Sequence, residues 1–434
     1  MADSEFVRVS NDRTHFTLGD KPFYFCGANC YYLLTRAADP GLVHEVTGVL
    51  NSIAASGLTV VRTWAFNDGA SQWNALQTQP GEFAESVFRA LDFVVAEAGK
   101  RGLKLLLDLT NYWQDYGGML QYVTWSRQQQ GLPEEGCRPE EFYTDGACQE
   151  MFRIFVTTIL LRAAHFVKQV DPNHLVTLDC EGFLGPSTPG SQCCNPYDCN
   201  FTGCDFLHDS HSPHIDFACC HLYPDLWLPK AAEEAKLRFA LSWLDVHTQL
   251  AGKLGKPLVL SEFGKKAGED PGSRAGYFDT VLGRVLKLMQ DGSPMAGSIF
   301  WMTAAPSYPE YDGFTIYLPA TPAVTQGGVL QGLQIPHGCT TEIEQPQTGP
   351  KGVKEREAAI AGEQQSRLGG LLKCLMRKLS IGRGPGGTMA VSRAEVQASA
   401  DVAESCPTQD TASIILAHAA QVAELNRQSS FAAS

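Results

Sequence analysis

The chain has 434 residues, 44% of them apolar and 19% charged, and its 34 Lys and Arg against 47 Asp and Glu give a net charge of −13. This apolar share supports a sizeable core, which excludes a wholly disordered chain and a minimal disulfide scaffold. The acidic balance repels polyanions, so the composition argues against general nucleic-acid binding and favours a neutral or cationic partner.

Features that bear on membranes and secretion point in different directions. No apolar run reaches the roughly 18 to 20 residues of a membrane span, so no transmembrane segment is expected. The start, MADSEFVRVS, has no cationic region followed by an apolar one, so no secretory signal is expected either. Yet 14 cysteines, seven of them between Cys180 and Cys220, and a glycosylation sequon at Asn200 would suit a secretory route. The compartment stays open at this point.

Short apolar runs alternate with segments of helical spacing. The runs begin near Phe23, Leu58, Leu103, His174, Asp216, Pro257 and Ser298, and helices are expected over residues 42–55, 84–100, 147–169, 232–251 and 277–290. Each run is short enough for a strand that is buried on both faces. The alternation of strand and helix predicts a parallel sheet, and its repetition over about 300 residues indicates an α/β protein with a (β/α)8 TIM barrel.

One strand of the expected barrel is missing. The runs begin 35 to 45 residues apart, except for an interval of 71 residues between Leu103 and His174. Because that interval is nearly a double period, the fourth strand is the one that the pattern lacks.

The composition changes after the last strand. Residues 1–321 are expected to form the barrel, and residues 322–408 are rich in Gly, Gln, Ser, Ala and Pro, which predicts a largely disordered insert. Within it, residues 369–380 (GGLLKCLMRKLS) could form a basic amphipathic helix, although a solvated charge run is the simpler interpretation. Residues 409–434 have helical spacing from 411 to 428 and could return to pack on the barrel.

Polar and aromatic residues end several of the predicted strands. In a parallel barrel, functional side chains lie at these carboxyl ends, where the sequence places Arg62, Trp64, His221, Tyr223, Glu262 and Trp301. A carboxylate can attack an anomeric carbon or stabilise an oxocarbenium-like transition state, and indole faces stack on pyranose rings. The set therefore suits a sugar polymer as substrate, with Glu262 as nucleophile and Arg62 and Tyr223 orienting it. The alternative is structural: a salt-bridged glutamate, tryptophans of ordinary barrel packing and a hydrogen-bonded core histidine.

These residues stand in blocks that resemble glycoside hydrolase family 5, most closely the plant-type endo-β-1,4-mannanases. The resemblance runs from about Phe6 to Tyr317, through blocks such as GLTVVRTWAFNDG, VDPNHLVTLDCEGFLG, IDFACCHLYPDLWL and KPLVLSEFGKK. It implies a (β/α)8 barrel that hydrolyses internal β-1,4 bonds of mannan, glucomannan or galactomannan with retention of configuration. It also implies that no cofactor is needed and that the protein acts outside the cell.

The resemblance also implies roles for single residues. Glu262 in SEFGK matches the family nucleophile, and the remaining matches to active-site and substrate-binding positions are Arg62, Trp64, Asn111, His221, Tyr223 and Trp301.

The sequence departs from the family at the second catalytic carboxyl group. Complete members carry an Asn-Glu pair at the end of the fourth strand, and no such block occurs here. TTILLR (157–162) resembles the helix before that strand and AAHFVKQVDPNHL (163–175) the helix after it, so the chain joins the two directly. Glu181, in CEGF, matches a glutamate that complete members have in addition, so the sequence does not predict that it takes over the acid/base role. A catalytically inactive, mannan-binding or structural relative is therefore the alternative function.

A stretch rich in cysteine and histidine permits another hypothesis. It contains Cys193, Cys194, Cys199, Cys204, His208, His211 and His214, enough ligands for a structural zinc ion. The spacing matches no regular zinc finger, so a loop with disulfides or free thiols is the preferred interpretation, and no metal is expected.

Overall fold

A computed structural model describes residues 6–163, 174–190, 194–196, 204–268, 271–319 and 410–432. The predicted insert at 322–408, with its basic segment at 369–380, lies outside the described residues, as does the sequon at Asn200. The elements described below belong to one compact unit, which spans Met1–Tyr308, Gly313–Ala320 and Val391–Ser434.

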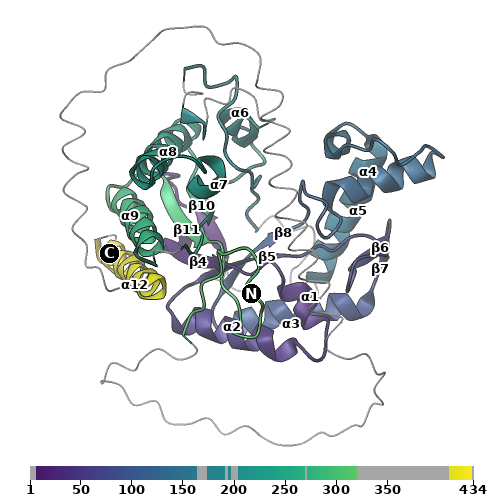
Figure 1. Ribbon diagram of the computed structural model, residues 1–434, viewed down its shortest axis with the longest axis horizontal. Helices are drawn as coiled ribbons and strands as arrows, with labels where there is room; N and C mark the ends of the chain where they lie inside the picture. The colour runs from purple at the N-terminus through teal and green to yellow at the C-terminus, as the bar shows by residue number, and fades with distance from the viewer. Residues whose placement is uncertain are drawn as a thin grey trace, which may run out of the picture. The chain divides into compact units, whose positions relative to one another are not determined.

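Six parallel strands form the main sheet of this unit, in the order β8-β5-β4-β11-β10-β9 (Figure 1). Their bounds are β4 (Phe25–Asn29), β5 (Val60–Trp64), β8 (Lys104–Asp108), β9 (Ala218–Leu222), β10 (Leu258–Phe263) and β11 (Met295–Phe300). The first strand, β4, pairs with the last, β11, which is the closure that a barrel requires. The sheet is therefore that of a (β/α)8 barrel, and within the described residues no strand pairs with the outer edge of β8, where the sequence predicts the gap.

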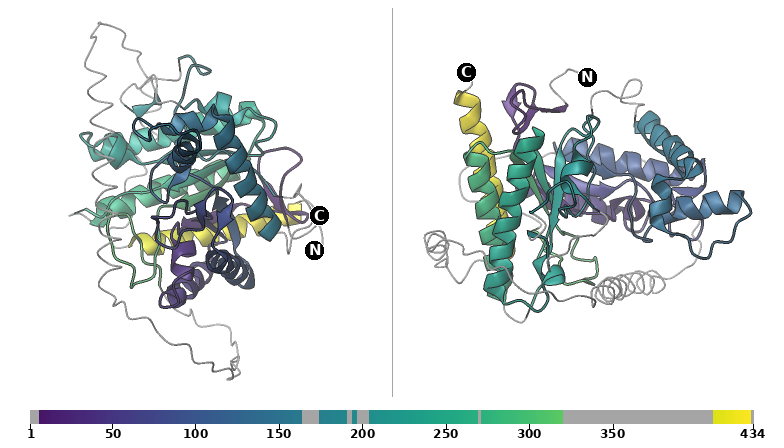
Figure 2. Two further views of the ribbon diagram at one scale, coloured as in Figure 1. Left: turned by 90° about the vertical axis from the view of Figure 1, so that its right-hand side faces the viewer. Right: turned by 90° about the horizontal axis from the view of Figure 1, so that it is seen from above.

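Helices flank this sheet (Figures 1 and 2). The longer ones are α2 (Val43–Ala55), α3 (Glu85–Lys100), α4 (Gly118–Gln129), α5 (Gly146–Ala163), α8 (Glu233–Leu254) and α9 (Pro271–Gln290). The shorter ones are α1 (Leu33–Ala37), the 3-10 helix η2 (Pro139–Tyr143), α6 (Phe206–Ser210) and α7 (Pro224–Trp227). Helix α8 ends where Gly255 adopts a left-handed conformation (φ 63°), a helix stop that glycine adopts without strain. In the described part of the chain, no helix combines the length and apolar character that crossing a membrane would require.

Two small antiparallel sheets complete the described strands: β1 (Val7–Val9), β2 (Phe16–Leu18) and β3 (Lys21–Pro22) form one, and β6 (Gln77–Gln79) and β7 (Glu82–Phe83) form the other. Sequence periodicity missed these short strands and the helices α1, α4, α6 and α7, because elements of two to five residues, or of mixed polarity as in α4, carry little periodic signal. It placed the starts of the longer helices within one residue, apart from α9, which begins at Pro271 rather than residue 277; residues 164–169 of the helix expected over 147–169 lie outside the described residues.

A buried cluster joins the strands beneath the site. It consists of Phe16, Phe25, Val60, Phe217, Cys219, Val259, Ala296 and Ile299. Gly27 allows β4 to approach β5 closely, since a Cβ atom at this position would lie 2.5 Å from the carbonyl oxygen of Val60. Apolar burial of this kind stabilises the sheet by roughly 25 cal/mol per Å² removed from water. The cluster therefore fixes the strands whose ends carry the polar residues.

The sheet is open where the fourth strand is missing. All five residues of β8 are partly exposed, whereas every residue of β4, β9 and β11 is buried. The strand expected from His174 is wrong, since residues 174–185 form no strand. This stretch accepts backbone hydrogen bonds from Asp216 N at Val176 O (2.8 Å) and from His221 N at Glu181 O (3.1 Å), both on the β9 side, and from Phe206 N at Phe183 O (3.0 Å). With no neighbour strand between it and β8, Val176 stays 51% exposed.

The C-terminal helix α12 (Thr411–Ala432) lies beside α9 (Figures 1 and 2). Its Asn426 side chain accepts a hydrogen bond from the backbone N–H of Tyr24 and donates one to the Tyr24 carbonyl, both at 2.8 Å. The helix thereby holds the chain just before β4, the strand that closes the barrel.

Asn426→Ala should lower the free energy of unfolding by about 1 to 3 kcal/mol, because it leaves both backbone groups of Tyr24 without their partner. Urea denaturation of the full chain measures this loss. Gln428→Ala, on the exposed side of the same helix, is the matched control and should leave stability nearly unchanged. Equal effects of the two substitutions would show that the bonds to Tyr24 contribute nothing.

Candidate active site

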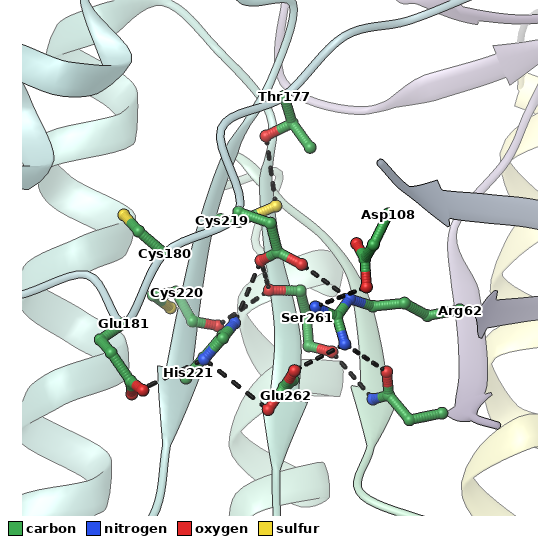
Figure 3. A network of polar contacts seen from close by, with 12 residues as sticks. Arg62, Asp108, Thr177, Cys180, Glu181, Cys219, Cys220, His221, Ser261 and Glu262 are labelled. Atoms are coloured by element: carbon green, nitrogen blue, oxygen red, sulfur yellow. Dashed lines mark hydrogen bonds and ion pairs between the residues drawn. The ribbon is translucent and has the colours of Figure 1, made fainter. Parts of the chain in front are cut away.

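The guanidinium group of Arg62 lies at the centre of a polar network at the carboxyl ends of the strands (Figure 3). It makes three ion pairs: Nη2 with Asp108 Oδ2 (2.9 Å), Nε with Asp179 Oδ2 (2.7 Å) and Nη1 with Glu262 Oε1 (2.6 Å). Nη1 also donates to the Asn29 side chain at 2.8 Å. Arg62 is 7% exposed, so these partners replace nearly all of its water.

The Glu262 carboxylate is held through both of its oxygens. Oε1 accepts from Arg62, and Oε2 accepts from the Tyr223 hydroxyl group at 2.7 Å. His221 Nδ1 lies 3.7 Å from Oε2. The side chain keeps 13% of its surface exposed, which leaves it accessible from the mouth of the sheet while two donors fix its orientation.

Asp179 orients the histidine from the opposite side. Its Oδ1 lies 3.1 Å from His221 Nε2 and accepts from the Ser261 hydroxyl group at 2.5 Å. Burial raises the pKa of Asp179, but the charges of Arg62 and His221 and the hydrogen bonds outweigh this effect. The net result is a pKa well below the ordinary value. The carboxylate therefore stays ionised and holds the imidazole in place.

Charges within the network set the protonation of the other groups. Burial lowers the pKa of His221, but the negative charges of Glu262 and Asp179 raise it well above its ordinary value. Burial and the charge of Glu262 raise the pKa of Tyr223, so its hydroxyl group remains a donor. Burial raises the pKa of Asp108 to about 7, against the opposing effect of Arg62. The network is thus built from a cationic histidine and arginine set among carboxylates.

Glu181 lies on the same imidazole nitrogen as Glu262. Its Oε2 is 3.6 Å from His221 Nδ1 and has no hydrogen-bond partner within the described part of the chain. The side chain is 38% exposed, against 13% for Glu262. In Figure 3, Glu181 and Asp108 lie on opposite sides of the network.

Three aromatic rings line up beside the network. Tyr31 stacks on Trp301 with ring centroids 5.4 Å apart and planes inclined by 4°, and its centroid is 4.9 Å from that of Trp64. Both tryptophans are partly exposed. Such partly exposed indoles offer the flat apolar surface on which pyranose rings stack.

The structure brings most of the residues singled out from the sequence into one place. Arg62, His221 and Tyr223 each approach Glu262, and Trp64 and Trp301 both contact Tyr31. The amide of Asn111 donates to the Asp115 carbonyl (3.2 Å) in the loop after β8.

Sequence reasoning missed several network residues: Asn29, Asp108, Asp179 and Ser261. Both aspartates end apolar runs, LKLLLD and HLVTLD, so the rule that located Glu262 would have located them too.

The zinc hypothesis finds no support in the part of the chain that the structure describes. No group of three or more potential ligands there is placed to hold a metal ion. Cys193 and Cys199, two of the proposed ligands, lie outside the described residues.

Three comparisons show what the chain resembles. It matches the family described as "GH family 5 beta-mannosidase-like" over residues 4–164 and 155–310, two ranges that meet near Arg162. It is 35% identical to mannan endo-1,4-beta-mannosidase 3 of Solanum lycopersicum over 369 residues, covering 75% of this chain and 90% of that protein. It is also 35% identical to mannan endo-1,4-beta-mannosidase 1 of Oryza sativa subsp. japonica, covering 74% and 83%. The endo-beta-1,4-mannanase of Thermotoga petrophila superposes with a TM-score of 0.57 at 27% identity, covering 69% of this chain and 74% of that one.

Asp179→Asn should lower the free energy of unfolding at neutral pH by about 3 to 5 kcal/mol, because it removes one charge from a buried network. The folded-state pKa of Asp179 lies below its ordinary value of 3.8, so its stabilising contribution is present above that pH and lost as the pH falls. Urea denaturation between neutral pH and about pH 3 should show a shallower acid loss in the variant.

Ser261→Ala removes one of the hydrogen bonds that lower the pKa of Asp179 but keeps the carboxylate and its ion pair with Arg62, so the acid loss of this variant should lie between those of wild type and Asp179→Asn. Parallel stability curves for wild type and Asp179→Asn would contradict the assigned role of Asp179.

Proposed function

This chain belongs to glycoside hydrolase family 5, in its β-mannosidase-like group, and we propose that it hydrolyses internal β-1,4-mannosidic bonds of mannan, glucomannan or galactomannan. The observation that carries the proposal is Glu262, a strand-end carboxylate held by Arg62 and Tyr223 beside two partly exposed tryptophans. Its relatives named above are mannan endo-1,4-β-mannosidases. On the same family grounds we propose an extracellular location.

In the proposed reaction, Glu262 attacks the anomeric carbon and displaces the leaving sugar. The tyrosine and the guanidinium group aim the carboxylate, and the ester that forms is then hydrolysed by water, so configuration is retained. Trp64 and Trp301 hold the pyranose rings of the polymer. The residues require no cofactor.

The leaving oxygen needs a proton, and the fourth-strand carboxyl that supplies it in complete family members is absent. Asp179 cannot serve, because three donors hold its oxygens and its pKa lies below the ordinary range. Glu181 is better placed, since its Oε2 accepts no hydrogen bond in the described part of the chain and lies 3.6 Å from His221 Nδ1, the nitrogen that is 3.7 Å from Glu262 Oε2. We therefore assign the proton transfer to Glu181.

A second function, binding of mannan without cleavage, is favoured by the open sheet beside β8. A retaining reaction needs two carboxyl groups about 5 to 5.5 Å apart, and the missing strand would carry one of them. The aromatic rings and the polar network would still bind the polymer. The two functions differ in whether reducing ends appear.

Glu262→Ala should lower the release of reducing ends from galactomannan by at least about a thousandfold, because the nucleophile is lost. A reducing-sugar assay measures this. Glu85→Gln, a substitution of an exposed glutamate on α3, is the matched control and should keep wild-type activity. Wild-type protein that binds galactomannan in affinity electrophoresis but releases no reducing ends would establish the second function instead.

Glu181→Gln should slow cleavage of galactomannan by roughly 100- to 10,000-fold, the usual contribution of general acid catalysis. Dinitrophenyl β-mannobioside, whose leaving group needs no proton, should be attacked by this variant at nearly the wild-type rate. If the variant cleaves both substrates more slowly by the same factor, or cleaves both at the wild-type rate, Glu181 is not the proton donor.

A further inference from the structure

Two cysteines lie side by side at the edge of the polar network. The Sγ atoms of Cys180 and Cys204 are 3.5 Å apart, although 24 positions separate them in the sequence. Both are free thiols in the structure and both side chains are partly exposed. In Figure 3 the sulfur of Cys180 points away from His221 and Ser261, so this thiol takes no part in the network.

Hydrogen bonds next to the two cysteines hold their segments together. Phe206 N donates to Phe183 O at 3.0 Å, and Ser187 N donates to the Asp205 side chain at 2.8 Å. Gly185 allows this close approach, because a Cβ atom there would lie 2.6 Å from the Asp205 side chain. The approach of the two sulfurs is thus fixed by contacts within a few residues of each.

We propose that Cys180 and Cys204 form a disulfide bond that ties the stretch at 174–185 to the segment before α6. A disulfide has an S–S distance of about 2.05 Å, so the sulfurs must approach by roughly 1.5 Å to form it. The tied stretch is the one that has no strand on its β8 side. The bond replaces part of the support that the missing strand would give to Asp179 and Glu181, the neighbours of Cys180.

The two thiols differ in how readily they ionise. Their mutual interaction lowers the pKa of Cys204, while the same interaction and burial raise the pKa of Cys180. Cys204 is therefore the thiolate that reacts first, and Cys180 follows.

The oxidant is a small-molecule disulfide such as oxidised glutathione. The Cys204 thiolate attacks one of its sulfurs, which forms a mixed disulfide and releases one glutathione thiolate. Cys180 then loses its proton to water, attacks the Cys204 sulfur and releases the second glutathione. Two protein thiols are oxidised to one disulfide while one glutathione disulfide is reduced to two thiols.

Peptide mapping of the full chain tests the pairing. After equilibration with oxidised glutathione and blocking of the remaining thiols, cleavage after glutamate gives residues 151–181, in which Cys180 is the only cysteine. Further cleavage after phenylalanine shortens the first peptide to residues 167–181, which still contain only Cys180, and places Cys204 alone in the peptide TGCDF. Mass spectrometry without reduction should show these two peptides joined, and reduction should separate them.

Linkage of Cys180 to a different cysteine, or blocking of both thiols after oxidation, would overturn the proposal. This outcome is independent of glycosidase activity, so it can be told apart from a failure of the proposed function.

Thermal unfolding supplies the second readout. The oxidised wild type should melt about 4 °C above the reduced protein, as expected for a bond that closes a loop of this size in a chain of this length. Cys204→Ser should abolish the difference, whereas Cys137→Ser, which changes another partly exposed thiol, should preserve it. A difference that persists in Cys204→Ser would contradict the proposed bond.

Discussion

The site depends on one buried guanidinium group that binds three carboxylates from separate parts of the chain. Arg62 on β5 binds Asp108 on β8, at one edge of the sheet, and Asp179 in residues 174–185, which lie next to β9 at the other edge. It also binds Glu262 on β10. Removing any one of these partners would leave an uncompensated buried charge, which lowers the stability of the folded state. The same ion pairs therefore connect the two sides of the gap left by the missing strand and aim the carboxylate that the chemistry needs.

Much of this could be predicted from the sequence, for identifiable reasons. Strands buried on both faces are visible as apolar runs, and the carboxyl-end rule located Arg62, His221, Tyr223 and Glu262. The 71-residue interval located the absent strand, since a regular repeat makes an omission visible. The strand expected at His174 failed because strand formation depends on a neighbour, which a local apolar run does not reveal. Asp108 and Asp179 were missed because their importance lies in sharing Arg62, a contact between residues 46 and 117 positions apart.

The residues for the two steps of the proposed reaction differ in how firmly the fold holds them. The half of the site that carries the nucleophile is built from β5, β9 and β10. Nearly all residues of these strands are buried, and each strand pairs with at least one other strand of the main sheet. The proton-donor half lies on residues 174–185, which form no strand and carry the partly exposed Glu181. A disulfide at Cys180 would strengthen this weaker half. The fold thus preserves attack at the anomeric carbon more securely than protonation of the leaving group.

The most direct test of the central claim is to trap the covalent intermediate on the wild-type chain. A β-mannobiosyl fluoride with fluorine in place of the hydroxyl group beside the anomeric carbon needs no proton donor, and the ester that it forms hydrolyses slowly. The tryptic peptide of residues 254–265 contains one carboxylate side chain, that of Glu262. Mass spectrometry should find the sugar on this peptide. Sugar on a peptide that lacks Glu262, or no adduct on a chain that hydrolyses the activated substrate, would contradict the account.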